Sequence, residues 1–377
     1  MRIGLIAAPW IPVPPPNYGG TELIVDHIAR GLVARGHDVR LFTVPESSCP
    51  VDKAWVLPEA AAPMGFTVPE AQHVLAAYQA FQDVDVIHDH TVLGPALAAG
   101  HKHPAIPVAF TNHNLVTSQT RPLLHAAAAV GSLVAISRDQ YSRDPDIEIS
   151  AVIHHGIDVG RYPFGPGGGG YAMFIGRMNP DKGPERAIRI ARAAGLPLIM
   201  IVKMWEPGEK AFFKEVVEPV LGPDVDLRLT STREETVELL RHAEALVNPI
   251  SWHEPFGLVM PEALSCGTPV LAFARGAAPE IIQHGVTGWL GADEADLAKA
   301  LTRAREFDRE TCRESVEQRF TLDRMARDHE RLYRRLINSK QAAAIGYRPA
   351  ELITGILRPA VRRRRPALAE ANVEPSS

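Results

Sequence analysis

Short apolar runs alternate with amphipathic stretches along most of the chain, a pattern typical of βαβ units around a parallel sheet. In the first half, the apolar runs predict strands at 2–8, 38–44, 84–88, 107–111, 133–136 and 151–153. In the second half, they predict strands at 171–175, 197–202, 225–229, 245–248 and 270–273. The intervening stretches predict helices near 183–194, 209–220, 233–242, 258–266, 277–283 and 293–305. The pattern therefore predicts an α/β protein with two Rossmann-like domains that face each other across a cleft.

A run of glycine and proline separates the two halves. The segment GRYPFGPGGGG at 160–170 holds two prolines and six glycines, so it cannot sustain a helix or a strand and is typical of an interdomain hinge. An amphipathic segment, TLDRMARDHERLYRRLI, predicts one more helix near the end. The predicted organisation is a first domain at 1–160, a hinge at 161–170, a second domain at 171–320, the last helix at 321–337 and a partly disordered tail at 338–377.

Composition narrows the class of protein. A chain of 377 residues with 46% hydrophobic residues is long enough for two sizeable cores. The net charge of −4 argues against a nucleic-acid binder, and three scattered cysteines argue against a disulfide scaffold or a zinc site. We see neither a signal peptide nor an apolar run long enough to span a membrane, so we expect a cytoplasmic protein. Arg362–Arg365 in the tail are either solvated or make a weak peripheral contact with anionic lipid at the inner membrane face.

The segment SWHEPFGLVMPEALSCGTPVLAF at 251–273 carries the strongest chemical signal. Glu254 and Glu262 stand eight residues apart, with a Pro-Phe-Gly turn between them that leads into a short predicted helix. The unpaired amides at a helix N-terminus favour phosphate. Glu254 would end the preceding strand and face a group bound there, and Glu262 lies far enough into the helix to reach a hydroxyl. The segment therefore predicts a site for a sugar nucleotide.

This segment resembles the E-x7-E signature of the retaining, GT-B-type glycosyltransferases of family 4. Four further segments are similar to landmarks of that family, in the same order: GGTE at 19–22, HGID at 155–158, FIGRMNPDKG at 174–183 and GAAPEII…GVTGWL within 276–290. The resemblance covers residues 1–337 and implies a GT-B fold. It also implies transfer of a hexosyl group from a nucleotide-diphosphate sugar to an acceptor hydroxyl, and family frequencies favour a UDP-sugar. The last predicted helix resembles the one that in this family crosses back toward the first domain.

Arg177 and Lys182 follow the first predicted strand of the second domain. At the carboxyl end of a parallel strand, a guanidinium and an ammonium suit two phosphates. The resemblance implies that both hold the donor diphosphate and neutralise the leaving nucleotide. Lys203 ends the next predicted strand, where the family often has Gly-x-Gly, and is either a further phosphate ligand or part of a base pocket.

The remaining donor-side residues are assigned through the same motifs. Gly19 and Gly20 allow the backbone to approach the donor closely, and Gly276 is a candidate for the same contact. Glu254 is expected to hold sugar hydroxyls and Glu262 the ribose. The full set of predicted donor contacts also includes the turn and the helix start, namely Phe256, Gly257, Leu258 and Val259.

Two polar segments of the first domain end predicted strands, VIHDH at 86–90 and TNH at 111–113. His113 matches a family position near the donor sugar and its proximal phosphate, and Asp89 and His90 are candidates for the acceptor side. The rival interpretation is a metal cluster, since His and Asp are good ligands. The spacing suggests no further ligand, and the family works without a metal bound by a DxD motif. We therefore expect no metal and no other cofactor.

HGID at 155–158 resembles a family turn at the end of the first domain, so we interpret it as structural. Gly156 is expected to supply a positive φ, and Asp158 an Asx-type turn.

The predicted mechanism is mostly electrostatic. Arg177, Lys182 and the helix amides would stabilise the departing diphosphate, and the leaving phosphate itself would act as the base, because no carboxylate nucleophile is evident. Two alternatives stay open. A nucleotide-sugar epimerase on the same fold would release free sugar or an isomer without any acceptor. A non-catalytic binding protein would be expected to have lost Glu254, Arg177 or Lys182, and all three are present.

Overall fold

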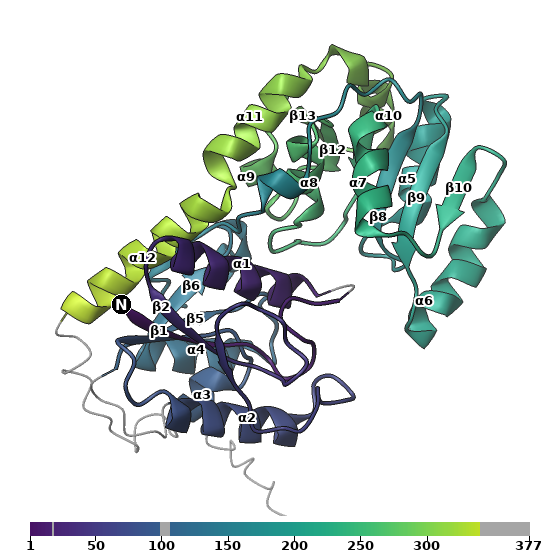
Figure 1. The fold of residues 1–377 in the computed structure, drawn as a ribbon. Helices are drawn as coiled ribbons and strands as arrows, with labels where there is room; N and C mark the ends of the chain where they lie inside the picture. Colours follow the sequence, from purple (N-terminus) through teal and green to yellow (C-terminus); the bar gives the residue numbers. More distant parts are fainter. Residues whose placement is uncertain (17–18, 99–105, 340–377) are drawn as a thin grey trace, which may run out of the picture. The chain divides into compact units, whose positions relative to one another are not determined.

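The computed structural model describes residues 1–16, 19–98 and 106–339, and Figure 1 draws their fold. These residues form two sheets in which every strand pair is parallel. The first sheet has the order β3-β2-β1-β4-β5-β6-β7, with β1 Arg2–Ile6, β2 Asp38–Phe42, β3 Asp52–Ala54, β4 Val86–Asp89, β5 Val108–Thr111, β6 Ser132–Ala135 and β7 Ala151–Val152. The second has the order β10-β9-β8-β11-β12-β13, with β8 Ala172–Arg177, β9 Leu198–Lys203, β10 Val225–Arg228, β11 Ala245–Asn248, β12 Val270–Phe273 and β13 Gly288–Gly291.

Helices connect most successive strands, the usual link between parallel neighbours. In the first domain they are α1 Gly20–Ala34, α2 Thr67–Ala80, α3 Gly94–Ala98 and α4 Arg121–Val130. In the second they are α5 Pro184–Ala193, α6 Pro207–Phe212, α7 Arg233–His242, α8 Val259–Ser265, α9 Ala278–Ile281, α10 Glu294–Leu301 and α11 Arg309–Arg319. With α12 Leu322–Asn338 they complete two Rossmann-like domains, the α/β architecture that the resemblance implies.

The helix α12 packs on the first domain although it follows the second in sequence, and Figure 1 shows it beside α1. Met325, Leu332 and Tyr333 share a hydrophobic core with Ile24 and Ile28 of α1. A Cβ at Gly31 of α1 would lie 2.7 Å from the Ala326 Cβ atom, so a glycine permits the close approach of the two helices. Arg35 adds ion pairs to Asp323 and Glu330 at 2.7 Å each. The chain thus returns to the first domain through a helix with an apolar face.

The predicted strands all occur, with ends within two residues of the expected ones. Two strands were not predicted, β3 and β13, and both lie at an outer edge of a sheet. β3 has three residues, two of them charged, and β13 has a glycine at each end, so neither shows an apolar run. The predicted helix 209–220 is divided into α6, a π-helical turn at 213–217 and a 3₁₀ turn at 218–220.

The turn at 155–158 differs in part from the prediction. Gly156 does not have a positive φ, so that expectation is wrong. A Cβ at Gly156 would clash with the carbonyl oxygen of Thr321, which means that the glycine serves close packing instead. Asp158 behaves as expected, because its Oδ1 accepts a hydrogen bond of 3.1 Å from the Gly160 amide.

No helix in the described part of the chain combines the length and the apolar character needed to cross a membrane. Arg362–Arg365, for which we predicted a weak lipid contact, lie outside the described residues.

Candidate active site

Two cations stand side by side at the carboxyl edge of the second sheet. Arg177 is the last residue of β8 and Lys203 the last residue of β9, and the two are paired in the register of these neighbouring strands. Ligands of open α/β sheets bind outside this edge. The strand order thus places Arg177, the predicted diphosphate ligand, next to Lys203, which was predicted to bind a phosphate or to form part of a base pocket.

Lys182 and Glu254 form an ion pair between the loop after β8 and the loop after β11. The Lys182 Nζ donates to Glu254 Oε2 at 2.5 Å, and the side chains are only 18% and 15% exposed. The ammonium also lies 5.5 Å from the centre of the Trp252 ring, within range of a cation–π contact. The structure therefore brings together two residues that the sequence assigned to the phosphate and to the sugar.

Glycines shape the loop that carries Glu254. Gly257 has φ 88° and Gly276 has φ 58°, a backbone conformation that side chains disfavour. A Cβ at Gly276 would lie 2.5 Å from the Glu254 amide nitrogen, and the next amide, of Ala277, donates to the Glu254 carbonyl at 3.0 Å. Gly276 thus holds the backbone of Glu254, and its predicted contact with the donor stays a prediction.

Glu262 lies in α8 beside two groups that the sequence did not indicate. The Tyr162 hydroxyl donates to Glu262 Oε1 at 2.7 Å, and Arg233 Nη1 donates to the Tyr162 oxygen at 3.3 Å. Burial raises the pKa of Glu262, an effect that the Tyr162 hydrogen bond and the charges of Arg233 and Lys203 oppose. Burial and the charge of Arg233 lower the pKa of Lys203 to about 8. Tyr162 lies in the predicted hinge. The only sequence signal for a role in the site is that it is an aromatic residue within a Gly/Pro-rich run.

Gly19 and Gly20 precede and begin α1. A Cβ at Gly19 would lie 2.7 Å from Glu22 Oε2, so the buried Glu22 carboxylate occupies that space. A Cβ at Gly20 would have Leu258 Cδ1 at 4.0 Å as its nearest neighbour. The first-domain glycine motif therefore faces the loop that leads into α8. This is the arrangement expected if both motifs serve one ligand.

A histidine cluster, which we define as His88, His90, His113, His155 and His329, is formed by four residues of the first domain and one of α12. Neighbouring rings of the cluster are in contact. The distance between ring centroids is 4.0 Å for His88 and His90 and 5.1 Å for His90 and His113. It is 5.3 Å for His113 and His155 and 5.2 Å for His88 and His329. His90 Nδ1 and His113 Nε2 share a hydrogen bond of 2.9 Å. The His155 ring packs edge-on against Phe256 at 5.0 Å, so the cluster reaches the donor-side turn. Sequence reasoning found His90 and His113 but not the roles of His155 and His329.

The cluster is electrically neutral at ordinary pH. Burial, reinforced by the His329 imidazole, lowers the pKa of His113 to about 3, and burial lowers that of His329 to about 4. His88 is fixed from both sides, by the Tyr333 hydroxyl at 2.6 Å and the Thr111 hydroxyl at 2.7 Å. The cluster therefore offers uncharged hydrogen-bonding groups rather than a cationic surface.

Asp89 points away from the histidine cluster. Its side chain is fully buried, and it accepts hydrogen bonds from the Tyr78 hydroxyl at 3.0 Å and from the amide and hydroxyl of Thr91 at 2.8 Å each. Burial raises its pKa to about 6. These bonds tie β4 to α2 and to the following loop. His90 is the better placed of the two acceptor-side candidates, and both assignments stay predictions.

The metal alternative gains no support from geometry. Within residues 1–16, 19–98 and 106–339, no group of three or more His, Cys, Asp and Glu residues is placed to hold a metal ion. Metal independence itself remains a prediction.

Glu280 of α9 bonds several residues of the first domain. Its carboxylate accepts the backbone amides of Arg138 and Asp139 at 3.0 Å each and bonds the His154 Nε2 at 2.7 Å. His253, next to Glu254, bonds the Asp139 carboxylate at 3.1 Å. These bonds link the loop after β6 to the loops that carry the donor-side residues.

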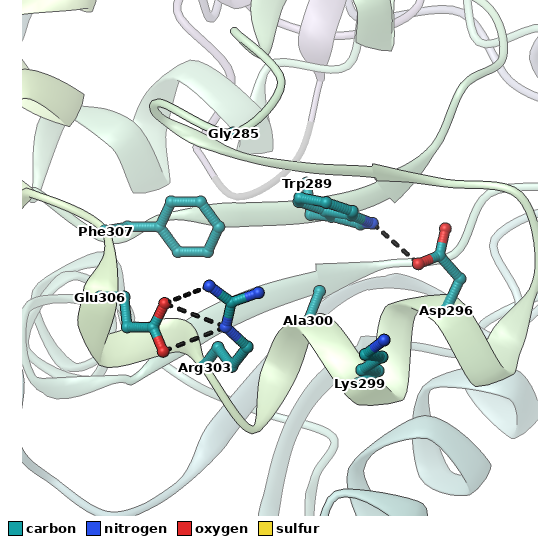
Figure 2. A pocket seen from close by; sticks show the side chains of 8 residues that line it. All are labelled: Gly285, Trp289, Asp296, Lys299, Ala300, Arg303, Glu306 and Phe307. Atoms are coloured by element: carbon teal, nitrogen blue, oxygen red, sulfur yellow. Dashed lines mark hydrogen bonds and ion pairs between the residues drawn. The ribbon is translucent and has the colours of Figure 1, made fainter.

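A cavity of about 200 Å³ lies elsewhere on the second domain, between β13 and α10. Figure 2 shows the rings of Trp289 and Phe307 along one side of it and Lys299 and Arg303 along the other. The Trp289 indole donates to Asp296 Oδ1 at 3.0 Å. None of the predicted site residues line this cavity, and its mixed charges do not define a ligand.

Comparison with known proteins identifies the family. Residues 165–319 match the family model of the glycosyl transferases group 1, and residues 18–161 match that of glycosyltransferase family 4. The chain is 26% identical to the D-inositol 3-phosphate glycosyltransferase of Mycolicibacterium smegmatis over 82% of its own length and 84% of that protein. It is 27% identical to the same enzyme of Mycobacterium leprae over 72% and 76% of the two chains.

Solved structures agree on the fold. The glycosyltransferase AviGT4, involved in avilamycin A biosynthesis, has a TM-score of 0.70 and 25% identity, covering 90% of this chain and 98% of that one. Sucrose-phosphate synthase from Thermosynechococcus elongatus has a TM-score of 0.74 and 22% identity, with 89% and 98% covered. Anabaena HepE in complex with UDP and glucose has a TM-score of 0.70 and 19% identity, with 89% and 100% covered. Because the two family models match the two domains in order, the chain belongs to the GT-B glycosyltransferases of family 4 and is an enzyme that transfers a sugar.

Proposed function

We propose that this enzyme moves a hexosyl group from a nucleotide-diphosphate sugar, by preference a UDP-sugar, to an acceptor hydroxyl with retention of anomeric configuration. The observation that carries the proposal is the Lys182–Glu254 ion pair at 2.5 Å, beside the strand ends that hold Arg177 and Lys203. Three cations and a carboxylate at one edge suit a ligand that has phosphates and hydroxyls together.

We assign the roles from the family resemblance, and the positions of these groups support them. Arg177 and Lys182 bind the diphosphate. When the donor binds, the Lys182 ammonium turns partly from the Glu254 carboxylate to a phosphate oxygen. Glu254 then accepts hydrogen bonds from sugar hydroxyls, and Glu262, oriented by Tyr162, accepts them from the ribose. His113, kept neutral by burial, offers an uncharged contact near the sugar. HepE, which has this fold, is known in complex with UDP-glucose, which favours the same class of donor.

The proposed reaction needs no protein nucleophile. The bond between the anomeric carbon and the phosphate oxygen breaks, and its electron pair leaves with the diphosphate, whose charge Arg177 and Lys182 stabilise. The acceptor hydroxyl attacks from the face that the leaving group vacates and passes its proton to the leaving phosphate oxygen. The products are the glycoside and the nucleoside diphosphate.

Thermal shift with a panel of donors tests the donor class. UDP-, GDP-, ADP- and TDP-sugars are added separately, because a ligand that binds the folded state raises the melting temperature by mass action. A UDP-sugar is expected to give the largest shift. A panel in which none of these donors shifts the melting temperature contradicts the proposal.

Product analysis with a radiolabelled donor separates the alternatives. The proposal expects label in a new glycoside when acceptors are supplied, and the acceptor panel includes D-inositol 3-phosphate, the substrate named for the curated relatives. An epimerase would give free sugar or an isomer without any acceptor. A non-catalytic protein would bind the donor and leave it intact.

The cytoplasmic location and the peripheral contact of Arg362–Arg365 with the membrane belong to the same proposal. Cell fractionation tests both, and a variant with all four arginines changed to glutamine is expected to lose any membrane-bound fraction.

A further inference from the structure

Two carboxylates, Glu209 of α6 and Glu206 just before it, hold Arg177, the proposed diphosphate ligand. Glu209 Oε1 accepts a hydrogen bond of 2.6 Å from Arg177 Nε, and Glu206 Oε1 accepts one of 2.7 Å from Nη2. The two acids differ sharply in exposure, since the Glu209 side chain is 5% exposed and the Glu206 side chain 69%. The same guanidinium therefore has one buried partner and one partner in solvent.

Glu209 is fixed at both of its oxygens. While Oε1 bonds Arg177, Oε2 accepts the backbone amides of Trp205 at 2.9 Å and Glu206 at 3.1 Å. This is the capping-box geometry at the start of α6, with Glu209 at its third residue. Burial on its own would raise the pKa of Glu209, but the two amides and Arg177 hold it below its ordinary value. Glu209 is thus an ionised, immobile partner for the Nε edge of the guanidinium.

Glu206 is the weaker partner, because its carboxylate lies largely in solvent. Exposed ion pairs contribute only about 0.2–1 kcal/mol, because solvent and side-chain entropy offset the attraction. A diphosphate carries more charge than a carboxylate and binds a guanidinium through two parallel hydrogen bonds. Because Glu209 binds Nε, a diphosphate that binds the guanidinium through two parallel hydrogen bonds would use Nη1 and Nη2, and Nη2 is the atom that Glu206 binds.

We propose that Glu209 is a positioning residue that aims Arg177 at the donor diphosphate, and that Glu206 occupies the guanidinium until the diphosphate displaces it. This inference rests on the proposed function, because it needs a donor with phosphates. It assigns opposite effects to two acids that lie three residues apart at the start of the same helix. One supports turnover, and the other competes with the substrate.

The isosteric pair E206Q and E209Q tests the inference. The E206Q substitution keeps the shape of the side chain and removes its charge, so the competitor is weakened. The E209Q substitution leaves a single side-chain oxygen, which cannot accept from both Arg177 and the two backbone amides. E215Q is the matched control, because Glu215 is exposed and lies in the π-helical turn that follows α6.

Calorimetry with UDP, GDP and ADP measures binding, and initial rates with the matching sugar nucleotide measure turnover. E206Q is expected to tighten nucleoside diphosphate binding by about two- to fivefold, the equivalent of one exposed ion pair, and to leave kcat within about twofold. E209Q is expected to lower kcat by roughly 10- to 100-fold, less than deletion of Arg177, with a smaller change in Kd. E215Q should match the wild type in both quantities.

A double-mutant cycle with R177A separates positioning from a general loss of structure. In the R177A background, E209Q and E206Q should each have little further effect, because both act through Arg177. An E209Q effect of full size in that background overturns the positioning role. If E209Q does not fold, E206Q still tests the displacement, and unchanged or weaker binding in E206Q overturns it.

Failure of this inference differs from failure of the proposed function. If the wild type binds none of the three nucleoside diphosphates, both fall. If the wild type binds and turns over while E206Q and E209Q change in the same direction, only the opposed roles of the two acids fall.

Discussion

The carboxyl edges of the two sheets differ in how their buried polar side chains are kept stable. In the second domain, partly buried cations stand against carboxylates, as in Lys182 with Glu254 and Arg177 with Glu209. Beside the first sheet, four imidazoles of the first domain and that of His329 in α12 pack together, and burial lowers the pKa of each one. The edge of the second sheet carries ion-paired side chains, whereas the histidine cluster beside the first sheet is uncharged.

The difference shows how one fold can divide a substrate between two domains. A charge removed from water must be paired or neutralised. Ion-paired cations can exchange a carboxylate for a phosphate, so the second domain suits the anionic part of a donor. Neutral imidazoles donate and accept hydrogen bonds without attracting anions, so the first domain suits hydroxyl groups. The predictions below test this division, from the largest expected effect to the smallest.

Removal of a charged side chain from the second domain should cause the largest loss of turnover. Arg177→Ala or Lys182→Ala is expected to lower kcat by roughly 10²–10³, as loss of one preorganised charge-stabilising group does, with a smaller rise in donor KM. The double variant should be less impaired than the product of the two singles, because both residues serve the same phosphates. Steady-state kinetics measures this, with the exposed Lys214→Ala as control. A variant that changes KM alone marks that residue as a uniform binder and not a group for the leaving diphosphate.

The neutral histidine cluster should make stability depend on pH. Because the folded pKa values lie below the ordinary 6.5, the unfolded chain binds more protons, and stability falls as pH drops below 6.5. Each buried histidine contributes a slope of up to about 1.4 kcal/mol per pH unit. Three buried carboxyls with raised pKa values act in the opposite direction: Asp89, raised to about 6, and Glu22 and Glu262. Three further buried histidines with lowered pKa values, His27, His37 and His73, add to the slope.

Urea unfolding between pH 7 and 5 measures this slope. His329→Gln is expected to flatten this slope by up to one proton equivalent. Equal slopes for wild type and His329→Gln would mean that the cluster is not held neutral by burial.

The ribose contact is expected to be smaller. Glu262→Gln should weaken nucleotide binding by about 1–2 kcal/mol, the range for a hydrogen bond to a charged group. Tyr162→Phe should weaken it less, since the hydroxyl orients Glu262 without touching the ligand. Calorimetry measures the nucleotide affinity of each variant. Unchanged affinity in a folded Glu262→Gln variant would rule out a contact of Glu262 with the ribose.

Chelation is expected to have no effect. With cations of the protein neutralising the diphosphate, activity should survive excess EDTA. A complete loss that manganese or magnesium restores would instead favour a metal at the histidine cluster or on the donor.

The sequence predicted the two sheets and the residues at their edges, for a local reason. Apolar runs mark buried parallel strands, and polar residues directly after them fall at the carboxyl edge whatever the rest of the chain does. Arg177, Lys182, Lys203 and Glu254 were located in this way and through family motifs. β3 and β13 were missed because short edge strands have little apolar pattern.

What the sequence alone determined is therefore the order of most elements and the family, and it predicted the main donor-side residues. Only the tertiary structure decided the partners of those residues. These partners are far apart in the sequence, and no periodicity links them. The separation is 32 positions for Arg177 and Glu209, 100 for Tyr162 and Glu262, and 241 for His88 and His329. Such contacts depend on how helices pack on sheets and where a buried charge finds its counterpart, and that balance of burial and pairing exists only once the chain is folded.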